Sequence, residues 1–197
     1  MMVAAVIAPE RLVFVDECGT HTSLAPIYGY APRGERLRLS VPRGRGKNTT
    51  LLASMSLEGM GPSLAVAGAT TAVVFEAYVE KVLAPSLEEG RVVVMDNLGA
   101  HRPKRVRELI EGRGCQLLYL PSYSPDYNPI EEAFAEIKGL LRQAAARTKE
   151  ALVEAIRARW IPSYGSLAVK RAVTSWSTGT TQANKIPPNG RSAGQRK

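Results

Sequence analysis

The chain has 197 residues and a mass of 21.3 kDa, which suits one compact domain and leaves little room for a second. Hydrophobic residues make up 45% and charged residues 22%, and no apolar run approaches the roughly 20 residues that span a bilayer. The first nine residues are too short for a secretory signal. Cys18 and Cys115 are too few for a disulfide framework or a zinc site, so we expect buried thiols in a cytoplasmic protein.

The positive charge of the chain is concentrated in two regions. The net charge is +8 and the isoelectric point is near 9.7, and residues 138–197 carry 12 Lys and Arg against 2 Asp and Glu. A second basic cluster is opposed only by Glu35 and consists of Arg33, Arg36, Arg38, Arg43, Arg45 and Lys47. Such stripes suit the phosphate backbone of a nucleic acid, although charge alone does not separate this interpretation from a solvated surface.

The first half of the chain reads mainly as strands. Residues 12–16 form an apolar run that ends in an acid, which predicts a strand buried on both faces. Residues 27–41 and 49–56 are predicted as further strands, followed by a turn at 58–62 and a returning strand at 64–67.

From residue 71 the pattern changes to alternating helices and strands. Apolar residues at helical spacing predict a helix that Pro85 ends, then a strand at 92–96, a helix opened by Pro103 and closed by Gly112 and Gly114, and a strand at 117–120. A turn-rich loop at 121–127 leads into a helix that starts at 128–129, and residues 151–160 extend the helical region. This order predicts an α/β fold whose mixed sheet has antiparallel strands first and parallel strands later.

Two of the three aspartates, Asp16 and Asp96, stand at the carboxyl ends of apolar strands, where α/β sheets place their active sites. A single acid at a strand end more often belongs to a hydrogen-bonded turn. Two such acids on neighbouring strands, about 4.8 Å apart, can share one divalent cation. The third aspartate, Asp126, lies in a Ser-Pro-Asp-Tyr turn, and Glu17 is expected on the opposite side of the strand from Asp16.

Glu131 is the candidate for a third metal-binding acid. It follows Asp96 after 34 intervening residues, enough for one helix, one strand and one loop to bring a new helix start beside the same edge of the sheet. The alternative is a capping box, with Asn128 as the helix cap, Pro129 at the first helical position and Glu131 folded back onto the cap. Spacing alone favours the capping box.

Two further residues near these acids can contact a phosphate. His101 follows Asp96 and could orient a water or touch a phosphate, although a single loop histidine is more often a plain hydrogen-bonding residue. Lys138 lies two turns after Glu131 on the same helical face and could reach DNA, although a solvated lysine is the default interpretation.

Three segments together resemble the catalytic domain of mariner-superfamily transposases, and most closely the branch of bacterial insertion sequence 630. They are Val13-Phe14-Val15-Asp16-Glu17, Val94-Met95-Asp96-Asn97 with His101, and residues 120–132, which end in Asn-Pro-Ile-Glu-Glu and are followed by Lys138. The 34-residue spacing between Asp96 and Glu131 is also a pattern of that family. The resemblance covers roughly residues 10–157.

The resemblance implies an RNase H-like fold, a mixed sheet flanked by helices, and a catalytic triad of Asp16, Asp96 and Glu131 that binds two Mg²⁺ or Mn²⁺ ions. It implies metal-dependent DNA cleavage at the ends of an insertion sequence followed by strand transfer into a target. DNA is then the partner, and the full-length protein is expected as a homodimer at the nucleoid, away from membranes. The residues expected to hold DNA are Arg33, Arg36, Arg43, Arg45, Lys47, His101, Lys138 and Arg142.

The two ends of the chain depart from this family. The first catalytic strand starts near residue 11, which leaves no room before it for the family's helix-turn-helix region. We expect residues 1–160 to form the catalytic domain and the acid-free residues 161–197 to be a disordered tail or the product of a frameshift. Two alternatives stay open: an inactive relic or inhibitor that binds DNA or an intact transposase, and a standalone RNase H-like nuclease. The sequence does not specify the terminal repeats, the target preference or the oligomeric state.

Overall fold

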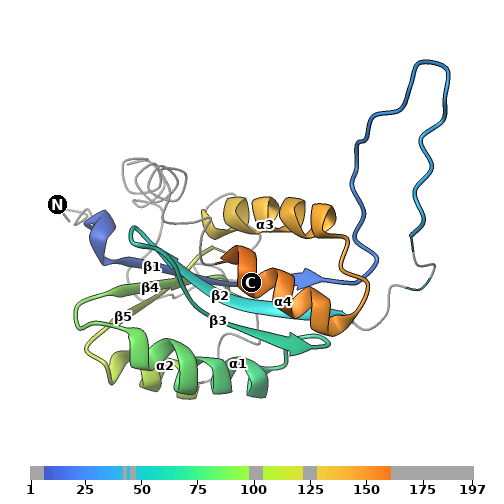
Figure 1. Ribbon diagram of the computed structural model, residues 1–197. Helices are drawn as coiled ribbons and strands as arrows, with labels where there is room; N and C mark the ends of the chain where they lie inside the picture. Colours follow the sequence, from blue (N-terminus) through green and yellow to red (C-terminus); the bar gives the residue numbers. More distant parts are fainter. Residues whose placement is uncertain (1–6, 42–43, 45–47, 98–103, 122–127, 161–197) are drawn as a thin grey trace, which may run out of the picture.

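The computed structural model describes residues 7–41, 44, 48–97, 104–121 and 128–160, which form a five-stranded sheet with helices on both faces (Figure 1). The strands are β1 (Leu12–Thr20), β2 (Thr49–Ser56), β3 (Gly59–Ala67), β4 (Val92–Met95) and β5 (Gln116–Tyr119). The helices are α1 (Ala72–Tyr78), α2 (Lys104–Glu111), α3 (Ile130–Ala144) and α4 (Lys149–Trp160). A 3-10 turn, η1 (Pro9–Arg11), precedes β1, and α1 continues through the π-helical turn η2 (Val79–Leu83) and the 3-10 turn η3 (Ala84–Ser86). The expected tail at 161–197 lies outside the described residues.

The sheet is mixed, in the spatial order β3-β2-β1-β4-β5. Strands β1, β2 and β3 pair antiparallel, whereas β4 is parallel to both β1 and β5. The expected fold class is therefore confirmed. The turn between β2 and β3 is tighter than expected, because the chain reverses at Leu57 and Glu58 and β3 already begins at Gly59. Gly59 has a φ of 123°, which a residue without a Cβ adopts readily.

Strand β1 separates two hydrophobic cores, because its successive side chains point to opposite faces of the sheet. Leu12, Phe14 and Cys18 belong to the core beneath α3 and α4, whereas Val13 and Val15 belong to the core beneath α1, η2 and α2. All five side chains are buried, which explains why β1 reads as a continuous apolar run. Both cysteines are free and buried, as expected.

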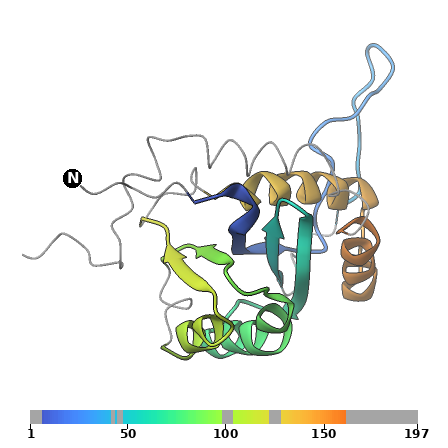
Figure 2. The ribbon, with the colours of Figure 1, turned by 90° about the vertical axis from the view of Figure 1, so that its left-hand side faces the viewer.

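The predicted strand at 27–41 is wrong. Residues 21–41 instead leave the body of the protein as an extended arm between β1 and β2, visible as the long blue loop in Figures 1 and 2. The arm includes exposed apolar side chains, Tyr28 (90% exposed) and Tyr30 (103%) among them. No strand of the described sheet lies beside the arm to take up its backbone hydrogen bonds, so alternating apolar residues did not suffice to make a strand there.

The arm is fixed at its root. Arg147, in the connection between α3 and α4, donates from Nη1 to the backbone carbonyls of Thr22 (3.1 Å) and Leu24 (2.9 Å). Farther out, Gly29 lies directly against the side chain of Leu37, so the two branches of the arm touch. These contacts set the direction in which the arm leaves the sheet.

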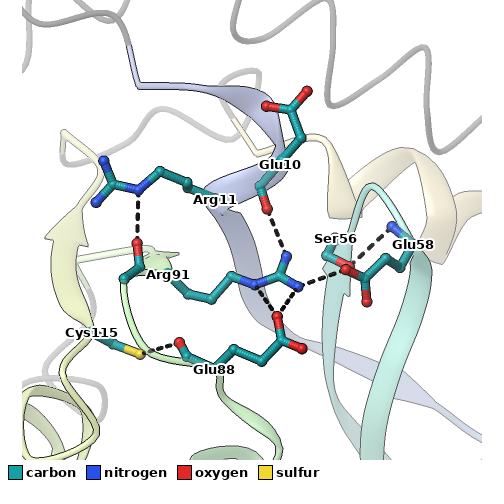
Figure 3. A network of polar contacts seen from close by, with 8 residues as sticks. Glu10, Arg11, Ser56, Glu58, Glu88, Arg91 and Cys115 are labelled. Carbon is teal, nitrogen blue, oxygen red and sulfur yellow. Dashed lines mark hydrogen bonds and ion pairs between the residues drawn. The ribbon is translucent and has the colours of Figure 1, made fainter.

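A polar network ties the elements together at the amino-terminal ends of β1 and β4 (Figure 3). The guanidinium of Arg91, whose side chain is only 13% exposed, donates to the carbonyl of Glu10 (2.6 Å), to Glu58 Oε1 (2.6 Å) and to Glu88 Oε2 (2.6 Å from Nη2). Arg11 Nε donates to the carbonyl of Gly90 at 2.8 Å. Because these contacts join η1, the β2–β3 turn and the residues before β4, they fix how β1 and β4 start side by side.

In the part of the chain that the structure describes, no helix combines the length and the apolar character needed to cross a membrane.

Candidate active site

Asp16 and Asp96 occupy corresponding positions at the carboxyl ends of two adjacent parallel strands. The register pairs Phe14 with Val94 and Val15 with Met95, so Asp16 and Asp96 are the next residues along. Phe14 and Val94 both face the core beneath α3. Because side chains alternate along a strand, the two acids lie on that same face, about one inter-strand spacing (~4.8 Å) apart.

The Asp16 carboxylate is only 7% exposed and has two hydrogen-bond donors. Its Oδ1 accepts from the backbone N–H of Glu17 at 2.7 Å, and its Oδ2 accepts from Asn128 Nδ2 at 2.8 Å. Burying a carboxylate is costly unless such donors compensate for the lost water.

Glu131 lies in the first turn of α3, and its side chain is exposed. Its backbone N–H donates to the carbonyl of Asn128 at 3.1 Å. The capping box that spacing favours is absent, because the cap position of α3 is Pro129, which makes no side-chain cap, and the Asn128 amide is bound to Asp16 instead. The Glu131 side chain therefore does not serve the capping role.

The buried thiol of Cys18 shows how the charged groups are arranged around β1. Burial raises the pKa of Cys18 to about 11, and the nearby ammonium of Lys138 opposes this shift through its charge and a hydrogen bond. The carboxylates of Glu131 and Asp16 raise the same pKa further. Lys138, Glu131 and Asp16 thus all lie close enough to Cys18 to act on one thiol, which places Glu131 and Lys138 of α3 over the strand that carries Asp16.

The three predicted acids do not form a closed cluster. Across the described ranges, no group of three His, Cys, Asp or Glu side chains is near enough together to hold a metal ion. The carboxylates of the three acids are nevertheless suitable metal ligands, because Mg²⁺ and Mn²⁺ prefer carboxylate oxygens. A further oxygen, Asn128 Oδ1, is buried beside Asp16 and has no hydrogen-bond partner among the described residues. This part of the sheet edge therefore fits a divalent cation in chemistry.

The predicted DNA-binding residues fall into three groups. Arg33 and Arg36 are exposed on the arm. Lys138 and Arg142 are half-buried one turn apart on α3, Lys138 beside Cys18. The remaining four lie outside the described residues and are Arg43, Arg45, Lys47 and His101.

Sequence reasoning missed the contact between Asn128 and Asp16. The two residues are 112 positions apart, and the local pattern Asn-Pro-Ile-Glu predicts a helix cap and gives no indication of a long-range partner. The burial of Asn128, which is only 4% exposed, requires hydrogen-bond partners for its amide, but this burial is visible only in the fold.

Comparison with known proteins gives a consistent result. The family description DDE superfamily endonuclease matches residues 11–153. The transposase of the transposable element Tcb1 from Caenorhabditis briggsae is 30% identical over 105 residues, which are 51% of this chain and 38% of that protein.

Two solved structures show the same fold. The Mos1 transposase paired-end complex with the left transposon end superposes with a TM-score of 0.71 at 17% identity, over 90% of this chain and 56% of that chain. The Mos1 transposase catalytic domain with Raltegravir and Mg gives 0.62 at 17% identity, over 92% and 87%. The expected RNase H-like fold is thereby confirmed. The chain spans 38% of the Tcb1 transposase and little more than half of the Mos1 chain in its DNA complex.

Proposed function

Because this chain belongs to the DDE superfamily endonucleases and has Tc1/mariner transposases among its homologues, we propose that it cuts DNA at the ends of an insertion sequence and joins the cut ends to a target. The observation that supports this most directly is the placement of Asp16 and Asp96 at equivalent positions of adjacent parallel strands, beneath the first turns of α3. The Asn-Pro-Ile-Glu motif at 128–131 and the 34-residue spacing before Glu131 support the insertion sequence 630 branch.

In this proposal Asp16, Asp96 and Glu131 hold two divalent ions, Mg²⁺ or Mn²⁺. When bound, such ions supply the charge that activates the attacking oxygen and stabilises the leaving 3′-oxygen of DNA. The chain itself provides positioning: β1 and β4 hold two carboxylates in fixed register, and α3 presents the third. Glu131 is exposed, so its side chain is free to turn toward the two aspartates when cations and DNA phosphate neutralise the three negative charges.

Basic residues on two elements fit the path of a DNA backbone. Lys138 and Arg142 lie on α3 beyond Glu131, and Arg33 and Arg36 extend outward on the arm. Lys138, Glu131 and Asp16 all act on the Cys18 thiol, so Lys138 lies near the proposed reaction centre, where it is expected to bind a DNA phosphate. With DNA as its substrate, the working protein is expected at the nucleoid.

Metal binding tests the proposed site without any DNA. Titrating Mn²⁺ into the wild-type protein in a calorimeter is expected to show uptake, and Asp96→Asn is expected to weaken it about tenfold or more. Glu132→Gln is the matched control, because Glu132 is exposed in the same helical turn as Glu131 and the variant changes the net charge equally. Absence of uptake by folded wild-type protein, or equal weakening by both variants, would contradict the proposed site.

The arm supports a homodimer. Between residues 36 and 41 the polar residues Arg36, Arg38 and Ser40 alternate with Leu37, Leu39 and Val41, so an extended backbone presents polar and basic groups along one edge and apolar groups along the other. Tyr28 and Tyr30 of the same arm are also exposed, and a run of exposed large apolar side chains typically marks an interaction surface. We infer that a second copy of the chain covers this edge while the arginines face DNA.

Sedimentation measures this association. The wild-type protein is expected to sediment as a dimer, and the double variant Tyr28→Ser with Tyr30→Ser as a monomer, because the variant loses the two most exposed aromatic side chains of the arm. Val73→Ser removes another highly exposed apolar residue (77%), from α1, and is expected to leave the dimer intact. A wild-type monomer, or a double variant that remains dimeric, would contradict the proposed dimer contact of the arm.

A further inference from the structure

Asn128 connects the first and third acids of the proposed site through two different groups. Its side-chain Nδ2 donates to Asp16 Oδ2 at 2.8 Å, and its backbone carbonyl accepts from the N–H of Glu131 at 3.1 Å. Asp16 belongs to β1 and Glu131 to α3, so these two bonds join the central strand to the start of the helix. We propose that Asn128 is a positioning residue, which sets the orientation of the Asp16 carboxylate and its separation from Glu131 for metal binding. This inference rests on the proposed function.

The hydrogen-bond pattern fixes how the amide is oriented. A carboxylate only accepts hydrogen bonds when it is ionised, so the Asn128 NH₂ group must face Asp16 and the carbonyl Oδ1 must face away. Asn128 is 4% exposed, and its Oδ1 has no partner among the described residues. An unsatisfied buried acceptor costs about 1–3 kcal/mol. A group that donates beside Asp16, such as a water bound to the cation, would satisfy this oxygen.

The start of α3 also gives up a stabilising interaction for this contact. Asparagine is among the best helix-capping residues, and a capping side chain contributes about 1 kcal/mol. Asn128 lies one residue before Pro129, which occupies the cap position of α3, and the helix has no side-chain cap. Its amide is bound instead to a carboxylate 112 residues away. The missing side-chain cap lowers the stability of the helix start, and this loss is explained if the hydrogen bond of Asn128 orients the acids instead of stabilising the helix.

Pro129 strengthens the connection. Its φ of −64° is fixed by the ring, so few backbone rotations separate Asn128 from Glu131. A change in the Asn128 side chain is therefore transmitted to the helix start that carries Glu131. In metal sites, residues that orient the ligands in this way typically change metal affinity about 10–100-fold when they are replaced.

Two variants and one control test the inference. Asn128→Leu has similar size and removes both polar groups, and Asn128→Ser keeps a small polar group that is too short to reach Asp16. Ile137→Val is the control, because Ile137 is buried in α3 and the change lowers stability by about 0.5–1.5 kcal/mol without touching the acids. For each protein we would measure the Mn²⁺ dissociation constant by calorimetry, the paramagnetic resonance spectrum of the bound Mn²⁺, and the melting temperature.

Both Asn128 variants are expected to bind Mn²⁺ about tenfold more weakly and to give an altered Mn²⁺ spectrum. Ile137→Val is expected to melt at a lower temperature but to keep the wild-type affinity and spectrum. If the wild-type protein binds Mn²⁺ and either folded Asn128 variant matches it in affinity and spectrum, the positioning role is wrong while the metal site stands. If affinity falls equally in Ile137→Val, the effect is one of stability and the positioning role is also wrong. If the wild-type protein binds no Mn²⁺, the proposed function and this inference both fail.

Discussion

Replacing Asp96 with Asn is expected to lower metal-dependent DNA cleavage by about a thousandfold or more, because it removes a charge that holds the cations at the reacting phosphate. Asn keeps the size of the side chain and its place beside Asp16 in the β1–β4 register, so the fold is expected to survive. Coulomb attraction between an amide and a divalent cation is far weaker than that of a carboxylate. The loss is therefore expected in the chemical step and in metal binding together.

The assay uses a DNA duplex that carries the terminal repeats of the element, incubated with Mg²⁺ or Mn²⁺ and separated on a denaturing gel. Glu132→Gln is again the charge-matched control and is expected to retain cleavage. Joined products in addition to nicked strands support a transposase, whereas nicks without joining support a standalone nuclease. Wild-type protein that binds DNA but does not cut it supports an inactive relic or inhibitor. Equal cleavage by Asp96→Asn and wild type would remove Asp96 from the site.

The sheet was predictable where burial leaves a strong local signal. β1 and β4 are buried on both faces, so each reads as a short apolar run, and the acid after each run marks the strand end. The change from period two to helical spacing likewise predicted α1, α2 and α3. These elements alone predicted the mixed sheet. They also predicted that Asp16 and Asp96 lie together at one edge of it.

The arm could not be predicted as an arm, because its pattern is that of a strand. Leu37, Leu39 and Val41 alternate with polar residues as they would on a half-buried sheet, but they are 53%, 54% and 38% exposed. The alternation of apolar and polar residues indicates that the apolar edge of the segment is covered, but it does not indicate whether the sheet of the same chain or another surface covers it. The strand expectation failed since the apolar edge faces away from the chain's own core.

The role of Asn128 was hidden for a different reason. A capping box is a local pattern of four residues, whereas the hydrogen bond to Asp16 depends on how α3 packs against β1. Local sequence rules predict the capping box and carry no information about the hydrogen bond to Asp16. The same packing places Lys138 beside Cys18. The sequence favoured a solvated lysine at this position, whereas in the fold Lys138 is half-buried near Asp16 and Glu131.

The docking of α3 on the sheet is expected to depend strongly on Phe134. This side chain is 1% exposed in the second turn of α3 and lies in the same core as Phe14 of β1. Phe134→Ala is expected to lower the free energy of unfolding by about 3–5 kcal/mol, because it removes a large buried ring and leaves a cavity. Gln143→Ala, an exposed position on the same helix, is expected to change it by less than about 0.5 kcal/mol.

Urea denaturation measures both variants, and the same samples can be titrated with Mn²⁺. Small domains have about 5–15 kcal/mol of stability, so Phe134→Ala is expected to remain partly or wholly folded at low temperature. In that folded fraction Mn²⁺ affinity is also expected to fall, because a loosened α3 no longer holds Glu131 over β1. The expected loss of about 3–5 kcal/mol combined with unchanged Mn²⁺ affinity would mean that Asp16 and Asp96 bind the cation without the helix, and that Glu131 joins the site only when DNA is present.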